Sequence, residues 1–149
     1  MTEVLFYHLT LKPLEDVLPG LLETCLQRDW RVVVQAGSAE RVTALDSLLW
    51  SYRDDSFLPH GTASDGEADR QPVFLTDGPD NPNGASVRFL VDRATAPDLS
   101  PYTRGVFLFD GNDEAAVSDA RQQWKALKAA GHALTYWQQT DDGRWQKKA

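Results

Sequence analysis

The chain has 149 residues and a formal net charge of -7; 42% of its residues are hydrophobic and 25% are charged. This size and composition are typical of one globular domain, so we expect a single domain over residues 1–149, with residues 140–149 as an extended tail. No apolar run is long enough to span a bilayer and no secretion signal is found, which excludes a membrane protein and predicts a cytoplasmic one.

The charge is distributed unevenly along the chain. Residues 117–149 contain six lysines and arginines against three aspartates, a balance of +3, so the first 116 residues carry -10. Tight binding to nucleic acid needs several phosphate contacts from a basic face, and an acidic chain is therefore not expected to hold DNA strongly by itself. The basic carboxyl-terminal part predicts attraction to a small acidic partner.

The amino-terminal part predicts a strand, a helix and a second strand. Residues 4–9 ("VLFYHL") and 30–37 ("WRVVVQAG") are apolar and β-prone. Between them, residues 14–29 have apolar side chains at helical spacing, although Pro19, followed by glycine, suggests that the helix proper begins there. Cys25, the single cysteine, falls at a core position of this helix and is predicted to be a buried, inert thiol in a reducing compartment.

The middle of the chain predicts one more helix and three strands. Ser38 is a suitable N-cap for a helix over residues 38–52, whose leucines recur on one face. After a polar loop come three short apolar runs bounded by turn residues, at 72–78, 86–92 and 105–111. Each of these runs is predicted to be a strand.

The carboxyl-terminal part predicts a final helix and a final strand. Asp113 opens a helix that runs to Ala130, and Gly131 is placed to end it in a left-handed conformation. The strand follows at residues 132–139. Strands that alternate with helices indicate a mostly parallel sheet covered on both faces, so the predicted fold class is α/β.

Sequence motifs for catalysis or cofactor binding are absent. The first strand is not followed by a glycine-rich phosphate loop, no serine lies in a nucleophile elbow, and the three histidines are too far apart in sequence to begin a metal site. We therefore expect no cofactor, no metal and no catalytic residue. The alternative is a small α/β enzyme or nucleotide-binding protein with a site around His60, Asp77 and Asp110, of which the two aspartates are more readily explained as turn formers.

The last helix carries a stripe of cations. At 100° per residue, Arg121, Lys125 and Lys128 fall within about a 60° sector, and Trp124 lies beside them. One interpretation is a solvated face whose cations complement the helix dipole. The other is a site for an acidic peptide ending in a hydrophobic residue, in which the ring packs on the apolar side chain and the cations hold carboxylates. His132, just past the helix, would add a donor at the rim.

A second surface surrounds the loop "DDSFLPHG" at residues 54–61. Exposure of large apolar side chains to water is unfavourable, by about 2 kcal/mol each, so something must cover them. They either fold back into the chain's own core or form an apolar patch for a partner protein, with a hydrogen bond from the histidine. Catalysis by this histidine would need a nucleophile or carboxylate partner, which nothing in the sequence supplies. The residues concerned are Trp50, Phe57, Leu58, Pro59 and His60.

Two strings of residues resemble a known family. "ALDSLLWSYRDDSFLPHG" at 44–61 and "ARQQWKALKAAGHALTYW" at 120–137 are similar to the chi subunit of bacterial DNA polymerase III holoenzyme, and the order of the elements agrees over nearly the whole chain. The resemblance implies an α/β fold like that of nucleotide-binding proteins but without the phosphate loop. It also implies a non-catalytic accessory role in DNA replication, within the clamp-loader assembly.

The resemblance further implies a site for the acidic, hydrophobic carboxyl-terminal tail of single-stranded DNA-binding protein. Val117 stands where relatives can carry a further cation, and Asp110 at the strand end would repel an acidic tail. The tail contact is therefore expected to be weaker in this chain. Mapped onto this chain, the tail site comprises Arg121, Trp124 and Lys125, with Lys128 and His132 further out.

A second partner follows from the same resemblance. Chi subunits pair with the small psi subunit, and some family members offer the same surface to a helicase instead. Mapped onto this chain, this surface comprises Trp50, Phe57, Leu58 and Pro59, with His60 adjacent.

Overall fold

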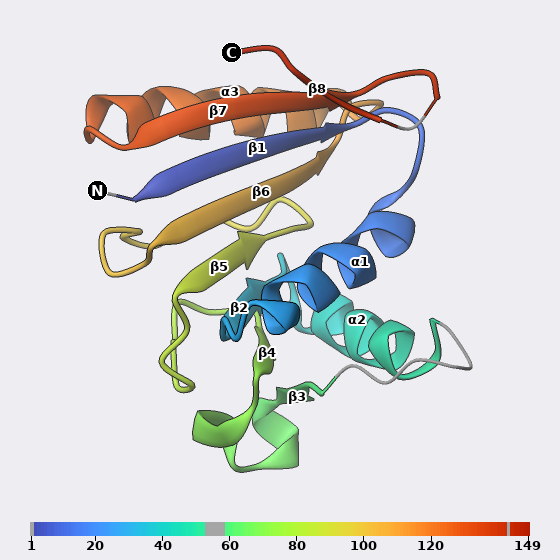
Figure 1. Ribbon diagram of the computed structural model, residues 1–149, viewed down its shortest axis with the longest axis vertical. Coiled ribbons are helices and arrows are strands. Elements are labelled where there is room, and N and C mark those ends of the chain that lie inside the picture. Colours follow the sequence, from blue (N-terminus) through green and yellow to red (C-terminus); the bar gives the residue numbers. More distant parts are fainter. Residues whose placement is uncertain (1, 53–58, 143) are drawn as a thin grey trace.

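The computed structural model describes residues 2–52, 59–142 and 144–149. Within this part of the chain, an eight-stranded sheet has the order β3-β4-β2-β5-β6-β1-β7-β8, and three α-helices pack on it (Figure 1). Neighbouring strands are parallel throughout, except that β7 and β8 are antiparallel. The predicted single α/β domain with a mostly parallel sheet is confirmed.

Helices and strands alternate along most of the chain. The α-helices are α1 (Leu14–Gln27), α2 (Ala39–Ser51) and α3 (Glu114–Ala129), and two short 3-10 helices, η1 (Ala63–Asp65) and η2 (Ala68–Arg70), follow β3. In the described ranges, no helix is both long and apolar enough to cross a membrane. The strands are β1 (Glu3–Leu9), β2 (Val32–Gln35), β3 (Gly61–Thr62), β4 (Val73–Thr76), β5 (Val87–Leu90), β6 (Arg104–Asp110), β7 (Ala133–Gln139) and β8 (Trp145–Lys147).

The two faces of the sheet are covered by different helices (Figure 1). Helices α1 and α2 pack on one face, where Leu22 and Leu45 join a core with two of the valines of β2, Val32 and Val34. Helix α3 packs on the other face, where Ala116 and Ala120 meet Phe6. The central strands β2, β4 and β5 are therefore buried on both faces, as expected for a parallel sheet.

Strands β1 and β6 supply both cores because successive side chains of a strand point to opposite faces. In β6, Phe107 and Phe109 face α3, whereas Val106 and Leu108 face the other layer. Phe6 of β1 is in register with Phe107, and the two rings stack with their centroids 4.5 Å apart. This arrangement puts a layer of aromatic rings beneath α3.

Helix α1 begins at Leu14, so the predicted start near Pro19 is wrong. Pro19 lies inside the helix and removes one main-chain hydrogen bond from it. Leu18 and Leu22 on either side of the proline are fully buried, and this burial against the sheet outweighs the lost bond. Cys25 is 7% exposed, which agrees with its predicted core position, and burial raises the pKa of its thiol.

The predicted ends of α2 and α3 are confirmed. The side chain of Ser38 accepts a hydrogen bond from the main-chain N–H of Arg41, as an N-cap does. Asp113 accepts hydrogen bonds from the first turn of α3 in the same way. After α3, Gly131 has a φ of 90°, which is the left-handed conformation that favours glycine.

The end of the chain belongs to the sheet rather than to a free tail. Strand β8 pairs with β7, with Trp145 opposite Gln139. The ring of Trp145 packs edge-on against Tyr7, with 4.8 Å between the centroids. An extended tail was expected over residues 140–149, but the described residues of this segment include a strand. Because β8 consists of one tryptophan and polar neighbours, no apolar run in the sequence predicts it.

Candidate functional site

A hollow of about 280 Å³ opens between α3 and β7, beside the cationic stripe of the helix. We call it the α3 hollow. Three of the predicted tail-site residues, Arg121, Trp124 and Lys125, line it together. The rest of its lining comes from β6, α3, β7 and the end of the chain: Phe109, Val117, Ala120, Tyr136 and Ala149.

Aromatic rings form the floor of the α3 hollow. Trp124 is half-buried, and its ring lies edge-on to Phe6 and to Tyr136, with centroids 5.3 and 5.9 Å away. Tyr136 also contacts Phe109, at 6.1 Å between centroids. Edge-to-face pairs at such distances stabilise the rings by about 0.5–1.5 kcal/mol each, so the floor is a pre-formed apolar surface.

Two cations stand at the rim of the hollow. Arg121 and Lys125 are exposed, one helical turn apart, and neither takes part in an ion pair among the described residues. Asp119 of the same helix is turned away from them and pairs with Arg93 at 2.5 Å. Both rim cations are therefore available to the anionic groups of a ligand that rests on the apolar floor.

A hydrogen bond beneath the hollow holds the Tyr136 ring. The Nδ1 atom of His8 lies 2.5 Å from the Tyr136 hydroxyl. Burial lowers the pKa of His8, and the charge of Arg121 lowers it further, while Asp110 acts in the opposite sense. Burial also raises the pKa of Tyr136. Both groups are thus mainly uncharged at neutral pH, and a single hydrogen bond joins the imidazole nitrogen to the hydroxyl.

The other two predicted tail-site residues lie outside the lining of the α3 hollow. Lys128 is exposed in the last turn of α3, where its charge also complements the helix dipole. His132 is half-buried after the helix, and its main-chain N–H donates to the carbonyl of Leu127. A ligand confined to the hollow would not reach them, whereas a ligand that extends along α3 toward its carboxyl end would.

Phe109 and Tyr136 belong to the site but were not predicted from the sequence. Both lie on strands rather than on the cationic helix, and a helical wheel cannot show them. The alternation of "FLFD" in β6 and "LTYW" in β7 does place Phe109 and Tyr136 on one face of the sheet. What the sequence does not show is that α3 crosses that face at these two residues.

The predicted partner-binding patch is only partly at the surface. Trp50, near the end of α2, is 58% exposed, and Pro59 is half-buried. Phe57 and Leu58 lie outside the described residues. His60 is only 6% exposed, and its ring lies 4.8 Å from that of Trp50. This corrects the expectation that His60 presents a hydrogen bond at the surface of the patch.

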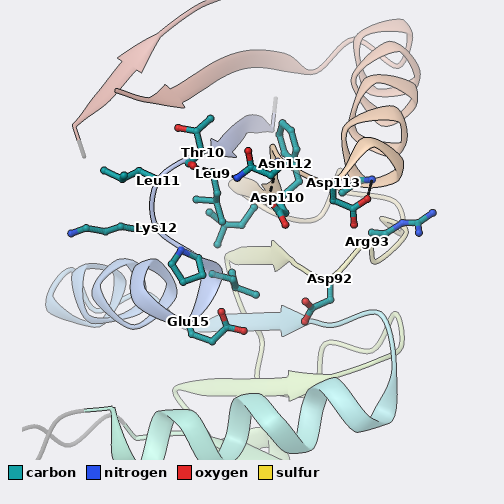
Figure 2. A pocket seen from close by; sticks show the side chains of 15 residues that line it. Leu9, Thr10, Leu11, Lys12, Glu15, Asp92, Arg93, Asp110, Asn112 and Asp113 are labelled. Atoms are coloured by element: carbon teal, nitrogen blue, oxygen red, sulfur yellow. Dashed lines mark hydrogen bonds between the residues drawn. The ribbon is translucent and has the colours of Figure 1, made fainter. Parts of the chain in front are cut away.

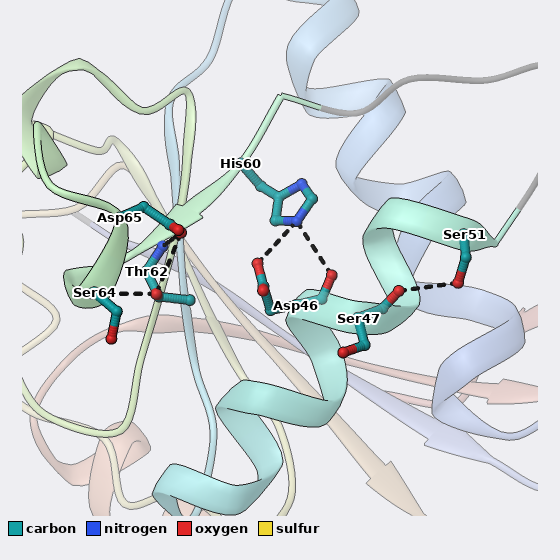
Figure 3. Close-up of polar contacts among 7 residues, drawn as sticks. All are labelled: Asp46, Ser47, Ser51, His60, Thr62, Ser64 and Asp65. Carbon is teal, nitrogen blue, oxygen red and sulfur yellow. Dashed lines mark hydrogen bonds and ion pairs between the residues drawn. The ribbon is translucent and has the colours of Figure 1, made fainter.

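Asp46 of α2 places a carboxylate beside His60, a partner that the sequence alone does not reveal. The Nε2 atom of His60 lies 3.1 Å from Oδ1 of Asp46 and 3.3 Å from its main-chain oxygen (Figure 3). Of these two oxygens, only the main-chain oxygen has hydrogen-bond geometry. The carboxylate oxygen lies close to the ring but does not form a directed hydrogen bond with it. The contact joins the start of β3 to α2, which explains the burial of His60 structurally.

A larger hollow, of about 480 Å³, lies at the carboxyl ends of β1, β5 and β6, where open α/β sheets usually hold ligands. Figure 2 shows four carboxylates around it, those of Glu15, Asp92, Asp110 and Asp113. Glu15 and Asp92 both pair with Arg41, at 3.1 and 2.9 Å. This acidic hollow suits an anionic ligand poorly.

The loop after β1 has its amides occupied by a side chain of the protein itself. Oε1 of Gln139, at the end of β7, accepts hydrogen bonds from the main-chain N–H groups of Thr10, Leu11 and Lys12, each at 3.1 Å. In nucleotide-binding α/β proteins, amides after the first strand cradle a phosphate. Here an uncharged amide oxygen takes that place, in agreement with the missing glycine-rich loop.

The alternative site around His60, Asp77 and Asp110 is not assembled in the structure. Asp110 lines the acidic hollow, whereas Asp77 lines a separate hollow of about 350 Å³ together with Asp46. Asp110 is the last residue of β6 and Asp77 follows β4; these strands are three positions apart in the sheet, or about 14 Å at the usual strand spacing. In the described residues, no group of three or more histidines, cysteines, aspartates or glutamates could hold a metal ion.

The chain is similar in sequence to known proteins in two comparisons. Residues 1–135 match the protein family described as "DNA polymerase III chi subunit, HolC". A protein from Rickettsia prowazekii (strain Madrid E), described as a probable DNA polymerase III subunit chi, is 29% identical over 91 residues. That match covers 61% of this chain and 55% of the relative, so the similarity extends over about half of the relative's length.

Proposed function

Because the chain belongs to the DNA polymerase III chi subunit family, we propose that it is a non-catalytic accessory subunit of the replicative polymerase, within its clamp-loader assembly. Its role is to bind the acidic carboxyl-terminal tail of single-stranded DNA-binding protein. The replicase is thereby tied to protein-coated single strands in the cytoplasm, and DNA itself is not held tightly.

The α3 hollow is the observation that supports tail binding. It combines an apolar aromatic floor with two cations, Arg121 and Lys125, that no described acidic residue pairs. An acidic peptide with a hydrophobic end needs these two features side by side. In this proposal Trp124 packs against the hydrophobic side chain, and the two cations hold the terminal carboxylate and the acid before it.

The charges around α3 set the direction of the bound tail. Asp110 and Asp113 lie near the amino end of the helix, and Lys125 and Lys128 lie toward its carboxyl end. Acidic residues of the tail are repelled from the first pair and attracted to the second. The hydrophobic end therefore sits in the α3 hollow, and the upstream acids run toward Lys128 and His132.

The interaction is expected to be of moderate strength. A short peptide loses conformational entropy on binding and offers few anchors, so a Kd near 1 μM, or about -8 kcal/mol, is appropriate. Charge pairs at an exposed rim are screened by salt, and affinity should fall as the salt concentration rises.

Titration of the tail peptide tests this proposal. Isothermal titration calorimetry would use the carboxyl-terminal peptide of the single-stranded DNA-binding protein of the same organism. We expect Trp124→Ala, Arg121→Ala and Lys125→Ala each to weaken binding at least about 5-fold. Arg70→Ala is the matched control, because Arg70 is a highly exposed cation on η2, outside the lining of the α3 hollow. Equal binding by Lys125→Ala and Arg70→Ala would show that the site is misplaced.

We further propose that the patch around Trp50 binds a second protein, of the psi type or a repair helicase. Trp50 supports this proposal, since a tryptophan that is 58% exposed at a helix end is an anchor typical of protein interfaces. Pro59 borders the patch, while Phe57 and Leu58 remain part of the proposal from the sequence alone. Co-purification with each candidate partner, compared between the wild type and Trp50→Ala, tests it; an unchanged yield of complex would exclude the patch.

A further inference from the structure

The outer edge of β7 is covered along only part of its length. Its inner edge pairs with β1 over Ala133–Gln138, whereas its outer edge pairs with β8 at Trp137–Gln139 only. The contact continues to Tyr136, which bonds to the main chain of Lys148 and Ala149. No described residue pairs with the outer edge of β7 before Tyr136.

Leu134 is the residue whose main-chain groups point outward from this uncovered edge. The N–H of Ala133 donates to the carbonyl of Thr2 at 3.2 Å, so Ala133 faces β1. Tyr136 faces outward, since its N–H and C=O bond to residues 148–149. The N–H and C=O groups of successive residues point to alternate edges of a strand. Those of Leu134 therefore point outward, as those of Tyr136 do, and have no hydrogen-bond partner among the described residues.

The uncovered edge lies beside the cationic stripe. Helix α3 crosses from β6 to β7 between parallel strands, so it runs antiparallel to β7. Arg121 and Tyr136 meet in the α3 hollow, and Lys128, two turns later on the helix, consequently lies beside the beginning of β7. A chain segment placed along Leu134 is thus flanked by positive charge.

We propose that the acidic peptide binds as an additional strand on β7, parallel to it, and exchanges main-chain hydrogen bonds with Leu134. This inference rests on the proposed function and adds the mode of binding. The hydrophobic end of the peptide lies in the α3 hollow beside Tyr136, and the acids pass Lys125 and Lys128 in turn. Because the upstream acids lie at the beginning of β7, the peptide runs in the same direction as the strand.

Strand addition explains how a peptide of repeated acidic residues is held in one register. Successive acidic side chains are nearly equivalent to Lys125 and Lys128, so charge alone would allow the peptide to slide. Unpaired edge groups are templates for an extended chain, and bonds to one residue's N–H and C=O fix the position of the peptide main chain. The charges then supply attraction, and the edge supplies alignment.

An ester scan of the peptide tests the pairing on the unmodified protein. The probe is a synthetic peptide of four aspartates followed by leucine and phenylalanine, with a free carboxyl terminus, and single amide N–H groups are replaced by ester oxygens. An ester removes one donor without adding bulk. We expect affinity to fall about 3- to 10-fold at the position that donates to Leu134 and to change little at its two neighbours, whose N–H groups point away.

Two substitutions at Leu134 test the same contact from the protein side. Leu134→Pro removes the outward N–H, a change that an edge position tolerates because that N–H does not bond to β1. Leu134→Ala removes a similar amount of side-chain packing and keeps the donor. Leu134→Pro should bind the probe about 3- to 10-fold more weakly than Leu134→Ala, with the folded state of both checked by thermal unfolding.

The outcomes separate this inference from the proposed function. The first outcome is that the probe binds, that Lys125→Ala weakens its binding, and that no ester position changes its affinity. Strand addition is then overturned, while the α3 hollow remains the site. A uniform loss at every ester position also overturns it, since pairing with one residue is position-specific. If the probe does not bind the wild-type protein at all, both proposals fail. Should Leu134→Pro not fold, the ester scan alone decides.

Discussion

Arg88 donates two hydrogen bonds to the side-chain oxygen of Gln35, from Nε at 3.1 Å and from Nη2 at 2.7 Å. Arg88 is fully buried and forms no ion pair among the described residues. Its other bonds go to the carbonyls of Gly78 and Asp80 and to the hydroxyl of Tyr102. The guanidinium thus ties the loop after β4 to the loop before β6 without a counter-charge.

Replacing Arg88 with lysine should destabilise the protein. An ammonium group has three donors at one point and cannot reproduce the bonds of the planar fork, so buried carbonyls lose their partners. We expect the free energy of unfolding to fall by about 2–4 kcal/mol, measured by urea denaturation. Arg31→Lys is the control, because Arg31 also bonds to two carbonyls but at a more exposed site. Equal losses in the two variants would contradict this account.

The low pKa of His8 should depend on Arg121. Burial is the main cause of the lowered pKa, and the charge of Arg121 is the next. Titration of the His8 ring by NMR should therefore give a pKa below the ordinary value of about 6.5, and Arg121→Gln should raise it toward that value. Lys128→Gln, which removes the same charge outside the α3 hollow, should have less effect. An unchanged pKa in Arg121→Gln would mean that the guanidinium does not lie over this end of the hollow.

The same shift predicts a dependence of stability on pH. The unfolded chain binds a proton at His8 more tightly than the folded protein does, so folding loses stability as pH falls. The contribution of His8 is fully present above about pH 6.5 and is lost as pH drops through the lower pKa of the folded state. Comparison of wild type and His8→Gln by urea denaturation at pH 7.5 and 5.5 measures it. The wild type should exceed His8→Gln in free energy of unfolding by less at pH 5.5 than at pH 7.5. A larger difference at pH 5.5 would contradict the lowered pKa of His8.

Local patterns predicted most of this fold. Helix caps such as Ser38 and Asp113 act within one turn, and strands buried on both faces are short apolar runs, so sequence alone identifies them. The start of α1 was wrong because tertiary burial of Leu18 and Leu22 overrides the local effect of Pro19. Strand β8 was missed for a similar reason: its pairing with β7 is a tertiary contact.

The candidate site was predictable only where it lies on one element. Arg121, Trp124 and Lys125 are close together on α3, so helical spacing joins them correctly. Phe109 and Tyr136 reach the same hollow from two strands that are separated by β1 in the sheet, and no spacing in the sequence encodes that meeting. The burial of His60 likewise depends on its contact with a residue of α2.

Removal of the Gln139 side chain should destabilise the loop after β1. Gln139→Ala leaves the amides of Thr10, Leu11 and Lys12 without their shared acceptor, and we expect a loss of about 1–3 kcal/mol in the free energy of unfolding. Gln139→Glu keeps an oxygen at the same place and should be less destabilised at neutral pH. Urea denaturation of both variants decides; if Gln139→Glu is the less stable of the two, the three amides are not the main partners of this side chain.

Introduction of a cation at Val117 should strengthen tail binding. Val117 lines the α3 hollow one helical turn before Arg121, and the long stem of a lysine can cover the apolar surface that the valine now covers. We expect Val117→Lys to bind the acidic probe peptide about 3- to 10-fold more tightly in 50 mM salt, and the gain to shrink in 500 mM salt because rim charges are screened. Ala126→Lys is the matched control, since it adds the same charge to an exposed position on another face of α3. An equal gain in both variants would mean that overall charge, rather than the α3 hollow, attracts the peptide.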